Sequence, residues 1–186
     1  MRFLIRDYLK KKLNIEKKYL NVLIDSTQSV SYLLSRRLKK GSKSLILGNG
    51  GSSSDADHFA AELVCKINDS RRALPVYSLT NPAIITAIGN DLGFEYIFSR
   101  QVEAYARKDD VVIGISTSGE SKNVINAINK ANDLECLTVG ITKKDSKLAD
   151  ICHYSVKVHS NDTQYIQEVH RVILHAMALY ISKVLK

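Results

Sequence analysis

The sequence predicts an α/β protein with a five-stranded parallel sheet flanked by helices, and three observations support this prediction. Five short apolar runs alternate with helical stretches, which is typical of a parallel sheet covered on both faces. A glycine-rich turn follows the first run, and a turn rich in hydroxyl groups follows the third. The expected strands are residues 44–47, 76–79, 111–115, 137–141 and 154–158.

Helices are expected at both ends of the chain. Apolar residues recur at helical spacing from Leu4 to Ile24 and again from Val30 to Leu38, before Gly41, which predicts two helices ahead of the first strand. A long terminal helix is expected over 162–184. At 186 residues the chain fits one domain, residues 1–186, with a helical segment at 1–43 and an α/β core with its last helix at 44–186.

The net charge of +8 lies in the N-terminal segment. Residues 1–43 hold twelve Lys or Arg against three acidic residues. Because aromatic side chains are not interleaved with these charges, we interpret them as a solvated helix face and expect no nucleic-acid partner.

Compartment and membrane contacts follow from composition. No apolar run approaches the roughly 20 residues of a membrane span, so we expect no membrane insertion. The basic N-terminus lacks the apolar core of a secretory signal. Three widely spaced cysteines, Cys65, Cys136 and Cys152, suit a reducing cytoplasm and are expected to be buried small hydrophobes.

The first glycine-rich loop, GNGGSSSD at 48–55, connects the first strand to a helix that carries His58 and Glu62. Glycines permit a tight turn with exposed N–H groups, and the start of a helix favours anions. His58 and Glu62 are four residues apart and share one helix face. The spacing fits neither G-x-x-x-x-G-K-[ST] nor G-x-G-x-x-G, so the loop predicts a site for a phosphorylated metabolite.

The second loop is STSGES at 116–121, and it precedes a helix expected over 122–132. Ligands of open parallel sheets bind beyond the carboxyl ends of strands. One serine would suffice to cap the helix, so four hydroxyls around Gly119 favour a phosphate site over a simple capped turn.

Four motifs in this order, GNGGS followed by DADHFAAEL, AIGNDLGFEYIFSRQVEA, ISTSGES and YIQEVHRVILH, resemble the phosphoheptose isomerases of the SIS (sugar isomerase) family. The resemblance implies a three-layer SIS fold and a homotetramer with active sites shared between subunits. It also implies conversion of sedoheptulose 7-phosphate to D-glycero-D-manno-heptose 7-phosphate, which supplies heptose to lipopolysaccharide or capsule.

The resemblance also implies roles for individual residues. Glu62 and His175 match the catalytic pair, and His58, Glu62, Gln167 and His175 match the ligands of one zinc ion per subunit. The expected substrate contacts are Asn49, Gly50, Gly51, His58, Glu62, Asn90, Asp91, Ser116, Thr117, Ser118, Ser121 and Gln167.

These residue types suit ketose–aldose chemistry, which moves a proton between adjacent carbons through an enediolate. We expect Glu62 to carry that proton and His175 to serve the oxygens or ring opening. A zinc ion would polarise the carbonyl, although a carboxylate coordinated to metal is a weaker base. His153, His159 and His170 are expected to be structural.

The chain departs from the family pattern at two places. Tyr165, preceded by Gln164, replaces an arginine, and Cys65-Lys66-Ile67 replaces G-R-[YF]. Each change removes a guanidinium group, which can donate two parallel hydrogen bonds to one anion. The loss bears on substrate preference or on subunit contacts. The alternatives are an isomerase of another phosphosugar, a sugar-phosphate sensor, or a non-catalytic SIS adaptor that binds a replication initiator and lacks the Glu and His.

Overall fold

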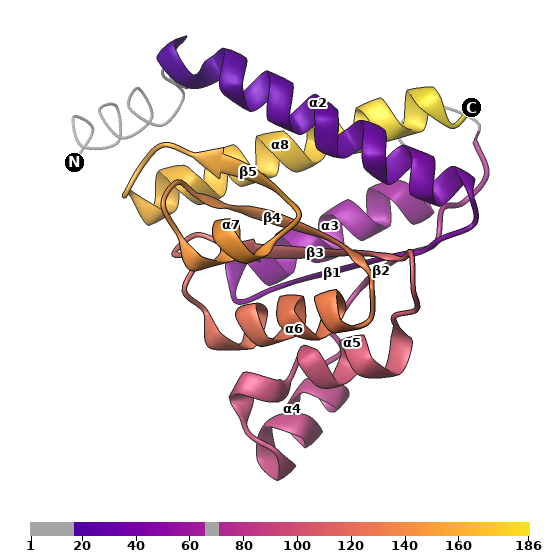
Figure 1. The fold of residues 1–186 in the computed structure, drawn as a ribbon, viewed down its shortest axis with the longest axis vertical. Helices are drawn as coiled ribbons and strands as arrows, with labels where there is room; N and C mark the ends of the chain where they lie inside the picture. The colour runs from indigo at the N-terminus through magenta and orange to yellow at the C-terminus, as the bar shows by residue number, and fades with distance from the viewer. Residues whose placement is uncertain (1–16, 66–70) are drawn as a thin grey trace, which may run out of the picture.

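The computed structural model describes residues 17–65 and 71–186, which form three layers (Figure 1). Its strands are β1 (Ser44–Gly48), β2 (Val76–Ser78), β3 (Val111–Ser116), β4 (Leu137–Lys143) and β5 (Tyr154–Val158). Its helices are α2 (Lys17–Lys39), α3 (Gly51–Val64), α4 (Pro82–Asp91), the 3-10 helix η1 (Phe94–Tyr96), α5 (Ser99–Tyr105), α6 (Lys122–Asp133), α7 (Lys147–Ile151) and α8 (Thr163–Val184).

The predicted sheet is confirmed: all five strands pair in parallel in the order β2-β1-β3-β4-β5. Each expected run lies within two residues of an observed strand. The central strands β1 and β3 are buried on both faces, which explains why the sequence shows continuous apolar runs there instead of alternation, whereas the edge strands β2 and β5 are partly exposed.

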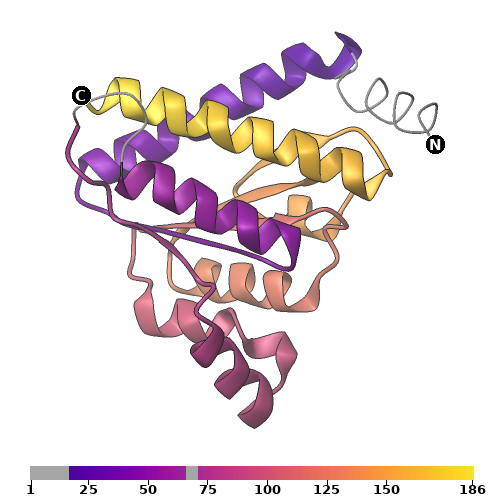
Figure 2. The same ribbon diagram turned by 180° about the vertical axis from the view of Figure 1, so that it is seen from behind.

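Two hydrophobic cores lie on opposite faces of this sheet. On one face Ile46, Ile113 and Ile141 pack against α2, α3 and α8. On the other face Leu45, Leu47 and Val112 pack against α5, α6 and α7. Successive residues of a strand point to opposite faces, so one strand serves both cores. Seen from behind, α3 and α8 lie side by side over the sheet (Figure 2).

The N-terminal segment contains α2 as one continuous helix, although two apolar stretches were expected in separate helices; residues before Lys17 lie outside the described part. The polar residues between the stretches do not interrupt the helix. Ser26 and Ser29 donate hydrogen bonds to the carbonyls four residues earlier, at 2.7 and 2.8 Å. Hydroxyls bonded back in this way are compatible with a helix interior.

Strand order places the site. The chain moves from β1 to β2 on one side and returns to β3 on the other side of β1, so the β1 and β3 carboxyl ends flank a topological switch point, where ligands of such sheets bind. The two loops singled out from the sequence follow these two strands. They are therefore neighbours in space, because Gly48 at the end of β1 pairs with Ile115 near the end of β3.

The three cysteines differ in burial. Cys136 is buried, whereas Cys65 is exposed, so the expectation of burial is wrong for Cys65. Burial raises the pKa of the Cys136 thiol to about 11. Among the helices of the described residues, none is both long and apolar enough to cross a membrane.

Candidate active site

The first loop is shaped by close backbone approach. A Cβ on Gly48 would lie 2.7 Å from the Ser52 Cβ and 2.9 Å from the Ile115 carbonyl oxygen, and Gly50 adopts a φ of +54°, which favours glycine. The N–H groups of Ser52, Ser53 and Ser54 donate to the carbonyls of Asn49 and Gly50. These three donors are therefore engaged within the loop, although the turn was expected to expose its N–H groups.

Asn49 and Gly51 link this loop to distant elements. The Asn49 amide exchanges two 2.9 Å hydrogen bonds with the amide of Asn123, at the start of α6. The Gln167 amide of α8 lies against Gly51, where a Cβ would approach its Nε2 to 1.6 Å. The glycine at 51 thus leaves room for the Gln167 amide, which a side chain at this position would displace. No sequence motif indicated a role for Asn123.

The second loop gathers hydroxyl groups. The Ser116 Oγ lies 3.3 Å from the Ser118 Oγ and 3.2 Å from the Ser121 Oγ, and it accepts a 3.0 Å hydrogen bond from the Gly119 N–H. Thr117 is half-buried on the same loop. Ser121 occupies the N-cap of α6, yet its side chain makes no capping hydrogen bond. The hydroxyls converge beside the helix start, as an anion site requires.

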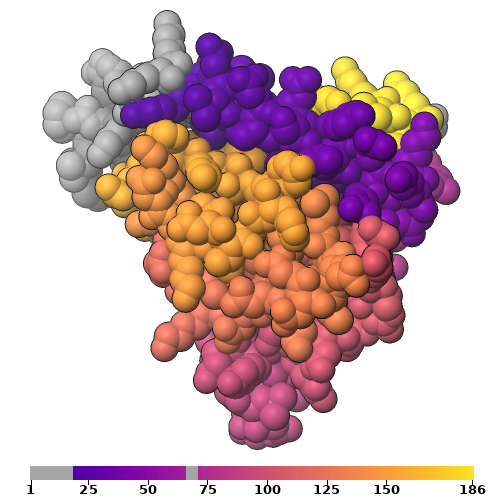
Figure 3. Space-filling model, viewed as in Figure 1, coloured from indigo at the N-terminus to yellow at the C-terminus, as the bar shows by residue number. Residues whose placement is uncertain are grey.

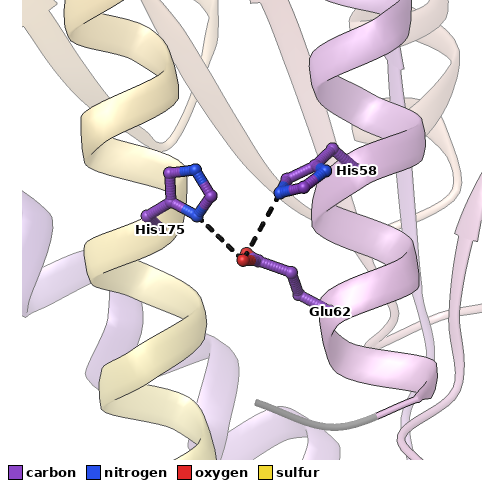
Figure 4. A group of neighbouring side chains, drawn as sticks. All are labelled: His58, Glu62 and His175. Carbon is purple, nitrogen blue, oxygen red and sulfur yellow. Dashed lines mark hydrogen bonds and ion pairs between the residues drawn. The ribbon is translucent and has the colours of Figure 1, made fainter.

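At the other end of α3, His58, Glu62 and His175 come together (Figure 4). The Glu62 Oε1 lies 2.8 Å from the Nδ1 of His175 on α8 and 3.5 Å from the Nε2 of His58. The side chain of Glu62 is 16% exposed, whereas that of His175 is 47% exposed. The trio therefore places a shielded carboxylate under two accessible imidazoles.

Two observations indicate that this trio fits a metal ion. Its candidate ligand atoms all lie within 4.8 Å of one another. The Glu62 Oε2 is buried and has no hydrogen-bond partner among the described residues. Two imidazoles and one carboxylate are a donor set that zinc accepts, with a further position for another ligand.

Two predicted groups do not join the trio within one chain. The Gln167 amide lies at Gly51, at the opposite end of α3 from Glu62. Asn90 and Asp91 end α4, and the hydrogen bond found for their side chains is the 2.8 Å bond between them. In Figure 3 the segment around α4 forms the tip of the molecule away from α2 and α8.

The other histidines have structural surroundings, as expected. His153 bonds Thr138, at 2.6 Å from Nδ1 to Oγ1, and His159 stacks on Tyr19. His170 is fully buried, and burial lowers its pKa to about 4, although the nearby Thr142 backbone partly offsets this shift. Tyr165 packs against the core, while Lys66 lies outside the described residues.

Sequence reasoning missed three charged residues around the trio. Arg171 binds Asp55 across α8 and α3, and Arg71 binds the end of α3. The position of Arg171, four residues from both Gln167 and His175, was a usable signal because it places all three on one helix face.

Comparison with known proteins gives the family. A family described as "SIS domain" matches residues 7–143. The phosphoheptose isomerase of Aliarcobacter butzleri is 46% identical over 167 residues, which cover 89% of this chain and 88% of that protein. The chain belongs to the phosphoheptose isomerase family.

Other phosphoheptose isomerases agree in sequence and in structure. The Geobacter metallireducens protein is 50% identical over 81% of each chain. A solved phosphoheptose isomerase from Neisseria gonorrhoeae is 34% identical, covers 98% of both chains and superposes with a TM-score of 0.90. The structure from Francisella tularensis gives 32% identity over 96% of both chains and a TM-score of 0.91.

Proposed function

We propose that the protein interconverts sedoheptulose 7-phosphate and D-glycero-D-manno-heptose 7-phosphate and so supplies heptose for lipopolysaccharide or capsule. The observation that carries the proposal is the 2.8 Å contact between Glu62 and His175 in a chain of the phosphoheptose isomerase family. A sugar-phosphate sensor or a non-catalytic adaptor has no need for this acid/base pair.

The pair suits a proton transfer through an enediolate. The Glu62 carboxylate takes the proton from C1 of the open-chain ketose and returns it to C2. His175 gives a proton to O2 and receives the proton of O1, so that the aldehyde forms at C1. When the Nδ1–H of His175 donates to Glu62, Nε2 has a free lone pair, so it takes the proton of O1 first and then gives that proton to O2.

We propose zinc as the cofactor, held by His58, Glu62 and His175. When bound, it would polarise the carbonyl as a Lewis acid. Gln167 can complete the set only from another subunit, because its amide packs on Gly51 of its own chain. We expect His58→Ala to lower both the zinc content, measured by atomic absorption, and the activity; an active enzyme with no bound metal would contradict a zinc requirement.

Substrate contacts are proposed at the loops. Ser116, Thr117, Ser118 and Ser121 would hold the phosphate, next to Asn49, Gly50 and Gly51. Ser52 and Glu62 are ten positions apart in α3, about 15 Å at 1.5 Å per residue. An extended heptose phosphate spans roughly 10 Å from phosphorus to C1 at ordinary bond lengths. This mismatch supports an active site that combines the loops of one subunit with the trio of another.

A homotetramer would supply such shared sites. An apolar groove of about 430 Å³ between α2 and α8 offers a contact surface. Its walls include Leu20, Ile24 and Val172, which are 40%, 50% and 54% exposed. We expect sedimentation to give a tetramer and Ile24→Glu to dissociate it, whereas a wild-type monomer at micromolar concentration would contradict the shared site. Asn90 and Asp91 would contact substrate as a partner's residues.

The direct test is turnover. The purified protein is incubated with zinc and sedoheptulose 7-phosphate, and aldose formation is followed by NMR in parallel with fructose 6-phosphate. Aldoheptose formation supports the proposal, and preferential turnover of fructose 6-phosphate identifies an isomerase of another phosphosugar. No turnover of either at any zinc level contradicts an isomerase. We place the reaction in the cytoplasm, in keeping with three free cysteines.

A further inference from the structure

The helices α3 and α8 lie side by side and run in the same direction (Figure 2), and we call the row of side-chain contacts between them the seam. The contact of His175 with Glu62 is drawn in Figure 4. On α8, Gln167, Arg171 and His175 follow each other at intervals of four residues. They meet Gly51, Asp55 and Glu62 of α3 in the same order. The Glu62–His175 contact is therefore one step of a longer seam.

The contact on one side of this pair joins Asp55 and Arg171. The Asp55 Oδ1 lies 2.9 Å from the Arg171 Nε and 2.7 Å from its Nη2. The Asp55 side chain is completely buried. A buried carboxylate that loses its cation carries a large desolvation penalty, so the two side chains are held together firmly. Arg171 is one helical turn from His175, and Asp55 is two turns from Glu62.

The contact on the other side is made by Arg71. Its Nη2 donates to the Glu62 carbonyl at 2.8 Å and its Nη1 to the Leu63 carbonyl at 2.7 Å. Both carbonyls belong to the last turn of α3, where carbonyl groups have no partner within the helix. Its Nε donates to the Ser182 Oγ of α8 at 3.0 Å. Ser182 is buried and lies two turns beyond His175.

We propose that Arg171 and Arg71 are positioning residues, which hold α3 and α8 in the register that keeps Glu62 against His175. The pair needs such support because its members are 113 positions apart and His175 is half-exposed. A net contribution of about 1 kcal/mol from their own hydrogen bond cannot fix two helices. A displacement of 1 Å at a reacting group can cost roughly 100-fold in rate.

The first test uses the Asp55–Arg171 contact and, for its kinetic readout, rests on the proposed function. Arg171→Gln and Asp55→Asn are expected to lower kcat at least tenfold and to leave KM within twofold, because neither change touches the loop at 116–121 that is proposed to hold the phosphate. The double variant should be no worse than the poorer single variant, since both changes break one contact. The control is Arg100→Gln, which removes an exposed pair with Glu103 on α5.

Several outcomes would overturn the positioning role. An unchanged kcat, a raised KM with normal kcat, or losses that add in the double variant would each mean that Arg171 acts on its own. Because Arg171→Gln leaves a buried charge and can fail to fold, the double variant, which has no buried charge, provides the measurement in that case. Arg71→Lys keeps the positive charge but loses the planar guanidinium that makes several hydrogen bonds at once. It is expected to lower kcat several-fold with KM unchanged.

A second readout does not depend on activity. Crystal structures of the double variant and wild type are compared at the Glu62 Oε1–His175 Nδ1 distance, which is 2.8 Å here. We expect this distance to exceed hydrogen-bonding range in the variant. An unchanged distance overturns the proposal. If wild type turns over no phosphosugar, the proposed function fails, while this distance still tests the positioning role.

Discussion

The two ends of α3 are built in different ways. At its start, glycines and serines that are contiguous in sequence form the loop, and the neighbouring loop at 116–121 is equally local. At its end, Glu62 faces a histidine that follows 113 positions later on α8. The comparison teaches that the geometry of the proposed phosphate loops is a property of short segments, whereas the proposed acid/base pair depends on how two helices pack.

The largest effect on kcat is expected at the end of α3, where Glu62 meets His175. Glu62→Gln keeps the shape but removes the proton acceptor, and His175→Gln removes the imidazole, so each should lower kcat by at least about 100-fold. The double variant should lose little more than either single one, because residues acting on one step fail as a unit. Steady-state kinetics on the ketose measure this, with His159→Gln as the control; near-normal kcat in Glu62→Gln would contradict the assignment.

Substitutions in the loop at 116–121, beside the start of α3, should change KM instead of kcat. Ser118→Ala and Ser121→Ala each remove a hydrogen bond to a charged group, worth about 1.5 to 3 kcal/mol, so KM should rise about tenfold to a hundredfold with kcat largely kept. Ser29→Ala on α2, whose hydroxyl bonds the Asp25 carbonyl, is the control. Wild-type KM in both loop variants would place the phosphate elsewhere.

A matched pair of glycines sharpens the contrast further. Gly119 and Gly41 both have positive φ, at +68° and +94°, so alanine at either should destabilise the protein by about 1 to 2 kcal/mol. Only at Gly119 would the new Cβ also meet a neighbour, the Ser146 Cβ at 2.3 Å. We therefore expect a raised KM for Gly119→Ala and a normal KM for Gly41→Ala; equal KM values would show that the loop tolerates the shift.

The smallest kinetic effect is expected at His170, which is buried on α8. Its pKa is lowered to about 4 in the folded state, so below pH 6.5 the unfolded chain gains the proton first and stability falls as the pH drops toward 4. The loss attributable to His170 between pH 8 and pH 5 is about 2 kcal/mol.

Urea unfolding at the two pH values measures this loss. His170→Leu should remove that part of the pH dependence, whereas His159→Gln should retain it. Both variants should keep a catalytic Glu62–His175 pair at pH 8. Equal pH dependence in His170→Leu and wild type would mean that other groups account for acid sensitivity.

Much of this protein is determined by its sequence. The apolar runs determine five strands, and Gly48, Gly50 and the hydroxyls of 116–121 determine two loops, because backbone conformation and period depend on neighbours in the chain. The resemblance identified Glu62 and His175 one by one. Only the tertiary structure decided that they touch, that Arg171 and Arg71 flank them, and that Gln167 lies at Gly51. These contacts depend on the packing of α8 against α3, which no local pattern specifies.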